Sequence, residues 1–426
     1  MITADALTDS ARLDGATIAF TTLRDLRAQA LRPAALPTTT PAAPVARPPL
    51  LIARPSHADS QVRTDTRSWI AALAGRHQAP APGEEALLHA VETSALSRPP
   101  VADTARAIDA DLAEVYVRLA RRWLELARGS EDPRYLNAAL KLLGACLVAP
   151  LPATELAADT LARALEALDT LTVHPPRPLM RPLADAAART TEPAATLEPR
   201  IAVLAGADSR GLPQFLAAAR TLPITGVVLH EAGRRAEPAG SAYASAWYPP
   251  SRSTRARLAP APSTVAHRRV EHRDWAAVAA YLTEWRTDLL VLIGMDVVPA
   301  PVLTVPTLGT INAHNGALPG YRGMDAVAWA VLAGDPVVCS VHHVTADVDA
   351  GNILAAREVS ADTPDLRQDV KGTQLDLLTQ VCRHVAATGA LPTGQPQTGT
   401  PRRYYRMHPA LRHRLDTSTH PTGAAS

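Results

Sequence analysis

The chain of 426 residues is 47% hydrophobic and 20% charged, and its 43 Lys and Arg against 41 Asp and Glu leave a net charge of +2. This composition is typical of a globular protein with two to three domains of roughly 150 residues each. The nearly balanced charge argues against a surface that tracks nucleic-acid phosphates. The three cysteines, Cys146, Cys339 and Cys382, have no CxxC spacing, so neither a zinc site nor a disulfide framework is expected.

The N-terminal sequence MITADALTDSARLDGATIAF lacks a basic start followed by an apolar run, so no secretory signal is expected. The longest strongly apolar stretch, Leu289 to Ile293, is far shorter than the ~18 residues that a membrane span needs. We therefore expect a cytoplasmic protein that binds neither membrane nor nucleic acid.

Residues 1–60 contain a stretch rich in Pro, Ala and Thr, from Leu31 to Pro55, which is typical of a linker. Over residues 61–172, apolar side chains recur at three- and four-residue spacing, which predicts a small all-α domain. Asp103 is expected to cap one of its helices, and the Asp132-Pro133 pair is expected to begin another. Its aromatic residues at helical spacing are expected to be core rather than a ligand groove.

Residues 173–199 are rich in proline and are predicted to be a second linker. From Ile201 the short apolar runs IAVLAG, ITGVVLH and DLLVLIG alternate with segments of helical length. Such alternation predicts an α/β domain over 200–390 with a doubly wound, mostly parallel sheet. Residues 391–426 are predicted to form a C-terminal tail.

The loop after the first apolar run carries Gly206 and Gly211 at the glycine spacing of a P-loop. Leu212 and Pro213 replace the Lys-Ser/Thr pair that would hold phosphate and magnesium. No G-x-G-x-x-G follows the strand either, so these glycines are expected to form a tight turn and not a nucleotide site.

Asn312 and His314 would lie on one face of a strand that ends at His314, because strand side chains alternate with a period of two. A carboxamide can donate a hydrogen bond to a developing oxyanion, and an imidazole can exchange a proton with an attacking amine. Asp349, in a glycine-containing loop after the next strand, could hold the imidazole in one tautomer. This set of groups suits acyl transfer.

The sequence NAHNGALPGYRG, followed by VDAGNIL, resembles the signature of the 10-formyltetrahydrofolate-dependent formyltransferase family. That signature is Asn-x-His, a short loop, Leu-Pro, x-x-Arg-Gly and later Asp-x-Gly, and the resemblance spans about Ile201 to Val385. It implies the formyltransferase fold, 10-formyltetrahydrofolate as formyl donor, no metal, and transfer to an amine. The catalytic residues that it implies are Asn312, His314 and Asp349.

The resemblance also implies residues that wall the folate pocket: Ile293, Met295, Val298, Leu318, Val348 and Gly351. Arg322 is expected to brace its loop by bonding carbonyl groups. The family often has Pro and Ser after the histidine, where this chain has Asn315 and Gly316, so a hydroxyl is missing there. Of His342 and His343, on opposite faces of a strand, one is expected to face the site or pack against the sheet, and metal binding is not expected.

Three branches of the family fit this chain less well. The first loop lacks the glycine-rich, phosphate-binding character of relatives that formylate glycinamide ribonucleotide. Fewer than about 70 residues follow Glu358, too few for the C-terminal β-barrel of relatives that formylate initiator methionyl-tRNA. The helical segment does not look like the βαββαβ regulatory domain of the hydrolases.

We therefore expect an N-formyltransferase that acts on the amine of a small molecule, such as an amino sugar, an amino acid or a peptide-like metabolite of specialised metabolism. Two alternatives stay open, a 10-formyltetrahydrofolate hydrolase and a non-catalytic binding protein on the same fold. The helical domain shows no catalytic set of polar residues. It is expected to bind a protein partner or a second copy in a homodimer, or to form one wall of the acceptor site.

Overall fold

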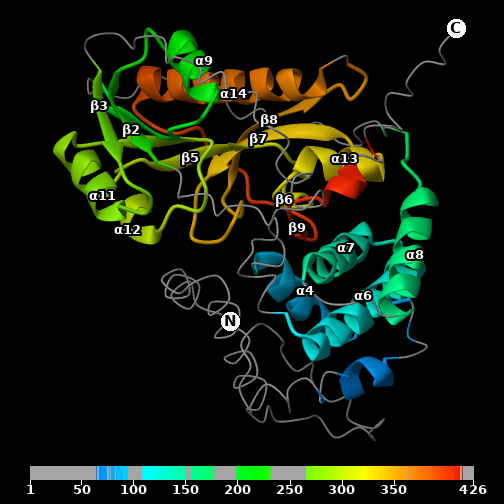
Figure 1. Ribbon diagram of the computed structural model, residues 1–426. Coiled ribbons are helices and arrows are strands. Elements are labelled where there is room, and N and C mark those ends of the chain that lie inside the picture. The colour runs from blue at the N-terminus through cyan, green and yellow to red at the C-terminus, as the bar shows by residue number, and fades with distance from the viewer. Residues whose placement is uncertain are drawn as a thin grey trace, which may run out of the picture. The chain divides into compact units, whose positions relative to one another are not determined.

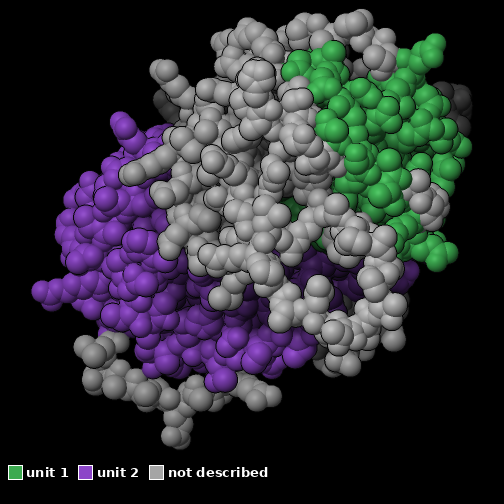
Figure 2. All heavy atoms as spheres, turned by 90° about the horizontal axis from the view of Figure 1, so that it is seen from below, with its two compact units in different colours: residues 1–172, 236–251, 405–426 green, residues 173–235, 252–404 purple. Residues whose placement is uncertain are grey.

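The computed structural model describes residues 64, 67–73, 76, 78–81, 83–94, 108–149, 155–175, 177, 198–231, 265–363, 365–412 and 415. The predicted linker from Leu31 to Pro55 and the predicted cap Asp103 lie outside these residues. The chain divides into two compact units (Figure 2). The helical unit comprises Met1–Thr172, Ala236–Ser251 and Tyr405–Ser426, and the sheet unit comprises Val173–Arg235 and Arg252–Tyr404.

The helical unit contains α4 (Glu84–Thr93), α6 (Ala110–Ser130), α7 (Pro133–Val148) and α8 (Glu155–Asp169). Asp109 and Asp132 cap α6 and α7, because their side chains accept the backbone N–H groups of Leu112 at 2.8 Å and Arg134 at 3.0 Å. The aromatic side chains at helical spacing are buried in its core: Tyr116, Trp123 and Tyr135. The predicted all-α region ahead of the sheet is confirmed.

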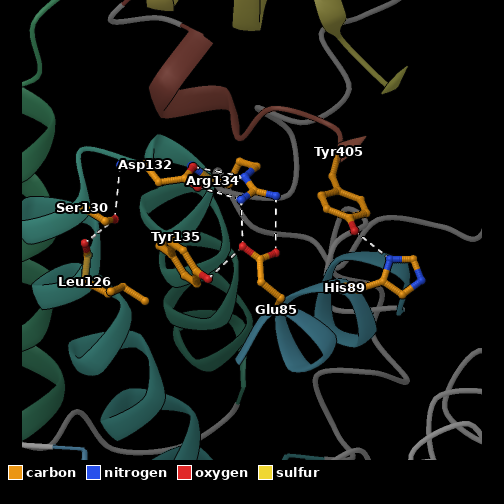
Figure 3. A network of polar contacts seen from close by, with 8 residues as sticks. All are labelled: Glu85, His89, Leu126, Ser130, Asp132, Arg134, Tyr135 and Tyr405. Carbon is orange, nitrogen blue, oxygen red and sulfur yellow. Dashed lines mark hydrogen bonds and ion pairs between the residues drawn. The ribbon is translucent and has the colours of Figure 1, made fainter. Parts of the chain in front are cut away.

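Buried charges in the helical unit are paired (Figure 3). Arg134 forms ion pairs with Asp132 at 2.7 Å and with Glu85 at 2.9 Å. Lys141 and Glu92, both fully buried, form a second pair. Removing one partner of such a pair would leave an uncompensated buried charge, so these contacts fix how the helices pack.

The chain after Tyr404 packs into the helical unit. The hydroxyl of Tyr405 is hydrogen-bonded to Nδ1 of His89 at 2.6 Å (Figure 3). Asn137 accepts the backbone N–H of His408 at 2.6 Å and donates to the carbonyl of Arg406 at 3.2 Å. Three apolar side chains of the segment are buried as well: Met407, Leu411 and Leu415. The core of the helical unit therefore contains residues from segments that precede and follow the sheet unit in sequence.

The sheet unit is built on seven strands in the order β3-β2-β1-β4-β5-β7-β8 (Figure 1). The strands are β1 (Ile201–Gly206), β2 (Ile224–His230), β3 (Ala266–Val270), β4 (Leu289–Ile293), β5 (Gly309–His314), β7 (Val337–His343) and β8 (Ile353–Val359). Pairs among the first five in this order are parallel, whereas β7 is antiparallel to both β5 and β8. The predicted mostly parallel sheet is confirmed.

Helices cover both faces of this sheet (Figure 1). One face carries α9 (Gly211–Ala218) and α14 (Leu366–Thr388), and the other carries α11 (Trp275–Glu284), α12 (Ala300–Leu303) and α13 (Ala326–Ala333). Burial on both faces explains why β1 and β4 are continuously apolar and do not alternate with polar residues. No helix among the described residues has a stretch long and apolar enough to cross a bilayer.

A second, two-stranded sheet lies beside the first. It pairs β6 (Arg322–Gly323) in parallel with β9 (Arg403–Tyr404). Tyr404 stacks on Tyr321 with ring centroids 5.0 Å apart and also contacts Trp329 of α13. These contacts fix β9 to the loop that follows β5. The next residue after β9, Tyr405, already belongs to the helical unit.

Candidate functional site

The end of β5 brings four polar side chains to one face of the sheet. Along β5, Asn312 and His314 alternate with Ala313, and across the antiparallel pair Asn312 lies opposite His342 and His314 lies opposite Ser340. Directly opposed residues of an antiparallel pair project from the same face. His342, and not His343, is therefore the histidine of β7 that shares a face with Asn312.

Asp349 lies between the two histidines. Its Oδ2 is 3.4 Å from Nδ1 of His314, and its Oδ1 is 3.4 Å from Nε2 of His342. Its Oδ2 also accepts the backbone N–H of Gly323 at 2.8 Å. Burial alone would raise the pKa of this carboxyl, but His342, the charge of His314 and the Gly323 N–H lower it to about 2. Asp349 is therefore an anion at neutral pH.

Each imidazole has an inner nitrogen, which faces Asp349, and an outer nitrogen, which is hydrogen-bonded to a backbone carbonyl. Nε2 of His314 is 2.5 Å from the Tyr321 carbonyl oxygen, and Nδ1 of His342 is 2.7 Å from that of His343. Because a carbonyl only accepts, both outer nitrogens carry a proton, and both inner nitrogens face Asp349. We call these three side chains the His314–Asp349–His342 cluster, because the carboxylate lies 3.4 Å from the inner nitrogen of each imidazole.

Burial lowers the pKa of His314, against the opposing effects of the Asp349 charge and the Tyr321 hydrogen bond. His314 is therefore uncharged near neutral pH, with its lone pair on Nδ1, the nitrogen that faces the Asp349 carboxylate. A neutral imidazole of this kind is ready to accept a proton.

Two amide groups next to His314 keep unused hydrogen-bonding capacity. The carboxamide of half-buried Asn312 makes no hydrogen bond to any residue that the structure describes. Oδ1 of Asn315 is buried and has no partner within the same described residues. Buried polar groups are normally paired, so these atoms are suited to contact a bound molecule.

Comparison with known proteins identifies the sheet unit. Residues 199–381 match the family model described as formyl transferase. This part of the chain is a formyl transferase domain. The resemblance read from the Asn-x-His and Asp-x-Gly motifs is confirmed for the domain.

Curated relatives of the formyl transferase domain include two methionyl-tRNA formyltransferases. The protein of Bacteroides thetaiotaomicron is 34% identical over 96 residues, which are 22% of this chain and 30% of that protein. The protein of Roseiflexus castenholzii is 37% identical over 131 residues, which are 29% of this chain and 41% of that protein. This chain thus spans less than half the length of these relatives.

Among solved structures, glycinamide ribonucleotide transformylase 1 from Symbiobacterium toebii is 25% identical with a TM-score of 0.35. The alignment covers 47% of this chain and 94% of that one.

Three of the residues expected to wall the folate pocket lie at the end of β4 or shortly after it, and they are distributed over both faces of the sheet. Ile293 follows Leu292, which is the register partner of Asn312, so Ile293 projects to the opposite face from Asn312, next to Gly211 of α9. Met295 and Val298 pack against the apolar cluster under α11 and α12. Their contact with a folate stays a prediction.

The remaining residues expected at the pocket lie on loops of the formyl transferase domain. Leu318 and Val348 are half-buried after β5 and β7, respectively. Gly351 is buried where no side chain fits, since an added Cβ would lie 2.0 Å from the carbonyl oxygen of His343. Among the described residues, no cluster of three His, Cys, Asp or Glu side chains is arranged to hold a metal ion.

Sequence reasoning left one residue of the site undecided and missed another. The period of two separates His342 from His343 but does not say which one faces Asn312, and the β5–β7 register decides it. Gln397 lies outside every recognised motif, yet its side chain accepts a hydrogen bond from Arg322 at 2.6 Å. Arg322 was expected to donate to carbonyl groups of its own loop. The sequence carried no local signal for this contact.

Proposed function

We propose that the chain is an N-formyltransferase that moves a formyl group from 10-formyltetrahydrofolate to the amine of a small molecule. The observation that carries the proposal is the position of Asp349 in a formyl transferase domain, 3.4 Å from both His314 and His342, on the sheet face that Asn312 shares. The donor supplies an activated formyl carbon. The side chains supply hydrogen bonding and proton transfer.

Asn312 is assigned to the oxyanion that forms when the amine attacks the formyl carbon. Its N–H groups are not used within the described structure and lie on the same face as the histidines. A preorganised donor at a developing negative charge is worth ~10²–10³ in rate. These unused donors support the assignment of the Asn312 carboxamide to the tetrahedral intermediate.

The proton of the attacking amine is assigned to the His314–Asp349–His342 cluster. Nε2 of His314 is already bonded to Tyr321, so the nitrogen that changes its protonation is Nδ1, which faces Asp349. The added positive charge on His314 is then stabilised by the carboxylate. We therefore assign the role of proton acceptor to the three groups and not to an isolated imidazole, and the same proton passes to N10 of the folate as its bond to the formyl carbon breaks.

Two features support a small amine as acceptor. Oδ1 of Asn315, buried and without a partner among the described residues, fits a ligand that donates an N–H group. The net charge of +2, from 43 basic and 41 acidic residues, is only a small excess of positive charge for binding a polyanion such as tRNA. The amine itself would be selected by loops around the site.

The test is incubation of the full chain with 10-formyltetrahydrofolate and a metabolite extract, followed by a mass-spectrometric search for products heavier by one formyl group. Asn312→Ala should lower their formation by ~10²–10³-fold, with Asn352→Ala, an exposed carboxamide, as control.

Other outcomes would overturn the proposal. Release of formate without any formylated amine would favour the hydrolase. Formylation of methionyl-tRNA in preference to small amines would reject the acceptor class. Donor binding without turnover of any kind would favour a binding protein.

A further inference from the structure

Gln397 lies beyond the matched formyl transferase residues, which end at 381, yet it bonds the loop that carries Asp349. Its Nε2 donates to the carbonyl of Asp349 at 2.7 Å and to that of Gly351 at 2.8 Å. Its Oε1 accepts Nε of Arg322 at 3.2 Å and Nη2 at 2.6 Å. The two N–H groups and both lone pairs of the amide are thus used.

The loop held by Gln397 needs such a constraint. Asp349 has a φ of 51°, in the left-handed region that side chains other than glycine rarely adopt. A conformation of this kind costs roughly 1–2 kcal/mol and persists when the surroundings over-determine it. The two hydrogen bonds from Gln397 fix the carbonyls on either side of Ala350, so they hold this turn.

Gln397 also links the loop to β6 by a second route. Gly323 of β6 donates its N–H to the Asp349 carboxylate, and its neighbour Arg322 bonds the Gln397 side chain. A closed ring of contacts therefore runs from the Asp349 carboxylate through β6, Arg322 and Gln397 to the Asp349 carbonyl. Gln397 itself is held in place, because Gln395 and Ile353 exchange two backbone hydrogen bonds of 2.8 Å.

We propose that Gln397 is a positioning residue, which holds the Asp349 carboxylate between His314 and His342. The inference rests on the proposed function and deepens it. It means that the formyl transferase site of this chain is completed by the segment after α14, from outside the matched domain.

Three variants of the full chain separate this role from general loss of structure. Gln397→Ala removes every contact of the amide. Gln397→Glu keeps an acceptor for Arg322 but removes both N–H donors and places a negative charge against two carbonyl oxygens. Gln395→Ala is the matched control, since Gln395 is exposed and its bonds to Ile353 are backbone bonds.

We expect both Gln397 variants to lower kcat by ~10–100-fold while KM for the formyl donor stays within about twofold, since misplacement of a reacting group by a fraction of an ångström affects the chemical step. Gln395→Ala should match the unaltered protein. A Gln397→Glu variant with unaltered kcat, or a change confined to KM, would overturn the proposal.

Hydrogen exchange provides a readout that does not depend on activity. The backbone N–H of Gly323 is protected by the Asp349 carboxylate, so its peptide should exchange faster in both Gln397 variants and not in Gln395→Ala. Unchanged exchange in the Gln397 variants would reject the positioning role. If the unaltered protein transfers no formyl group, the proposed function fails, and the exchange measurement still decides the role of Gln397.

Discussion

The carboxylate of Asp349 accepts the backbone N–H of Gly323 at 2.8 Å, although 26 residues separate the two in sequence. Gly323 has a φ of 94°, and a Cβ added there would lie 2.3 Å from the carbonyl oxygen of Tyr404. Both the direction of its N–H and the close approach of β9 therefore require glycine. The position of the Asp349 carboxylate thus depends on a backbone group as much as on side chains.

Gly323→Ala should lower both stability and turnover. The left-handed conformation alone costs roughly 1–2 kcal/mol for a residue with a Cβ, and the contact with Tyr404 forces β6 and β9 apart. Gly320→Ala is the matched control in the same loop, because its added Cβ would meet its nearest neighbour at 3.5 Å, an ordinary contact. Urea denaturation and kcat of both variants check this, and equal behaviour of the two would contradict it.

His314→Ala should lower the turnover rate by ~10²–10⁴-fold with the fold intact, the usual size of a general acid–base contribution. His267→Ala, which removes an exposed imidazole from β3, should leave the rate unchanged. Steady-state kinetics with a formylated product as readout measure the difference. Near-full turnover of His314→Ala would show that the cluster does not accept the proton.

His342→Gln should raise the pKa of Asp349 from about 2 toward its ordinary value of 3.8, because His342 is one of the groups that lower it. His343→Gln, which changes the neighbouring side chain on the opposite face, should leave that pKa in place. The measurement is a carbon NMR titration of the Asp349 carboxyl. A carboxyl pKa that is the same in both variants would remove His342 from the cluster.

The same substitution should change the acid sensitivity of the fold. A depressed carboxyl pKa contributes stability above the unfolded-state value near 4, and this stability is lost as pH falls toward 2. His342→Gln should therefore lose less unfolding free energy than the unaltered chain over that window. Denaturant titrations at about pH 5 and pH 3, one unit on either side of the unfolded-state pKa, compare the two proteins.

His408 should make the helical unit sensitive to mild acid. Burial, with a smaller effect of the Lys141 charge, lowers its pKa from 6.5 to about 3. Between these values the unfolded chain binds a proton that the folded chain does not. The free energy of unfolding therefore falls with falling pH, by up to ~1.4 kcal/mol per pH unit.

His408→Asn tests this dependence, because an amide oxygen can replace Nδ1 as acceptor of the Ala410 N–H, which lies 3.1 Å away. The variant should lose less stability on acidification than the unaltered chain, and His174→Asn, at an exposed position, should lose as much as the unaltered chain. Urea midpoints at a neutral and a mildly acidic pH measure the difference. Identical pH dependence in all three proteins would contradict the assignment to His408.

Local patterns were sufficient to predict most elements of the sheet unit. The runs IAVLAG, ITGVVLH and DLLVLIG are the strands β1, β2 and β4, because a strand buried on both faces must be apolar throughout. The Asp132-Pro133 pair begins α7, since a capping carboxylate and a proline at the first turn act within a few residues. In β5, Asn312 and His314 share a face through the strand period alone.

Strand pairing and contacts between residues far apart in the sequence could not be predicted from such local patterns. β7 runs antiparallel to β5, in a register that places His342 opposite Asn312. This arrangement depends on which strands pair. The contact of Gln397 with the Asp349 loop joins residues 48 apart through side-chain amide bonds that no spacing rule describes. The packing of Tyr405 against His89 likewise depends on where the chain returns after the sheet unit.

The contact between Asn137 and His408 spans 271 residues and encloses the whole formyl transferase domain within the helical unit's sequence. During synthesis, α4, α6 and α7 leave the ribosome well before residues 405–408, which contact His89 of α4 and Asn137 of α7. The domain in between can fold as soon as it emerges. The helical unit must wait for the contact between Asn137 and His408, whose very high sequence separation makes it a slow kind of contact to form. Completion of the helical unit thus depends on residues 405–412, and the sheet can fold before the helical unit closes.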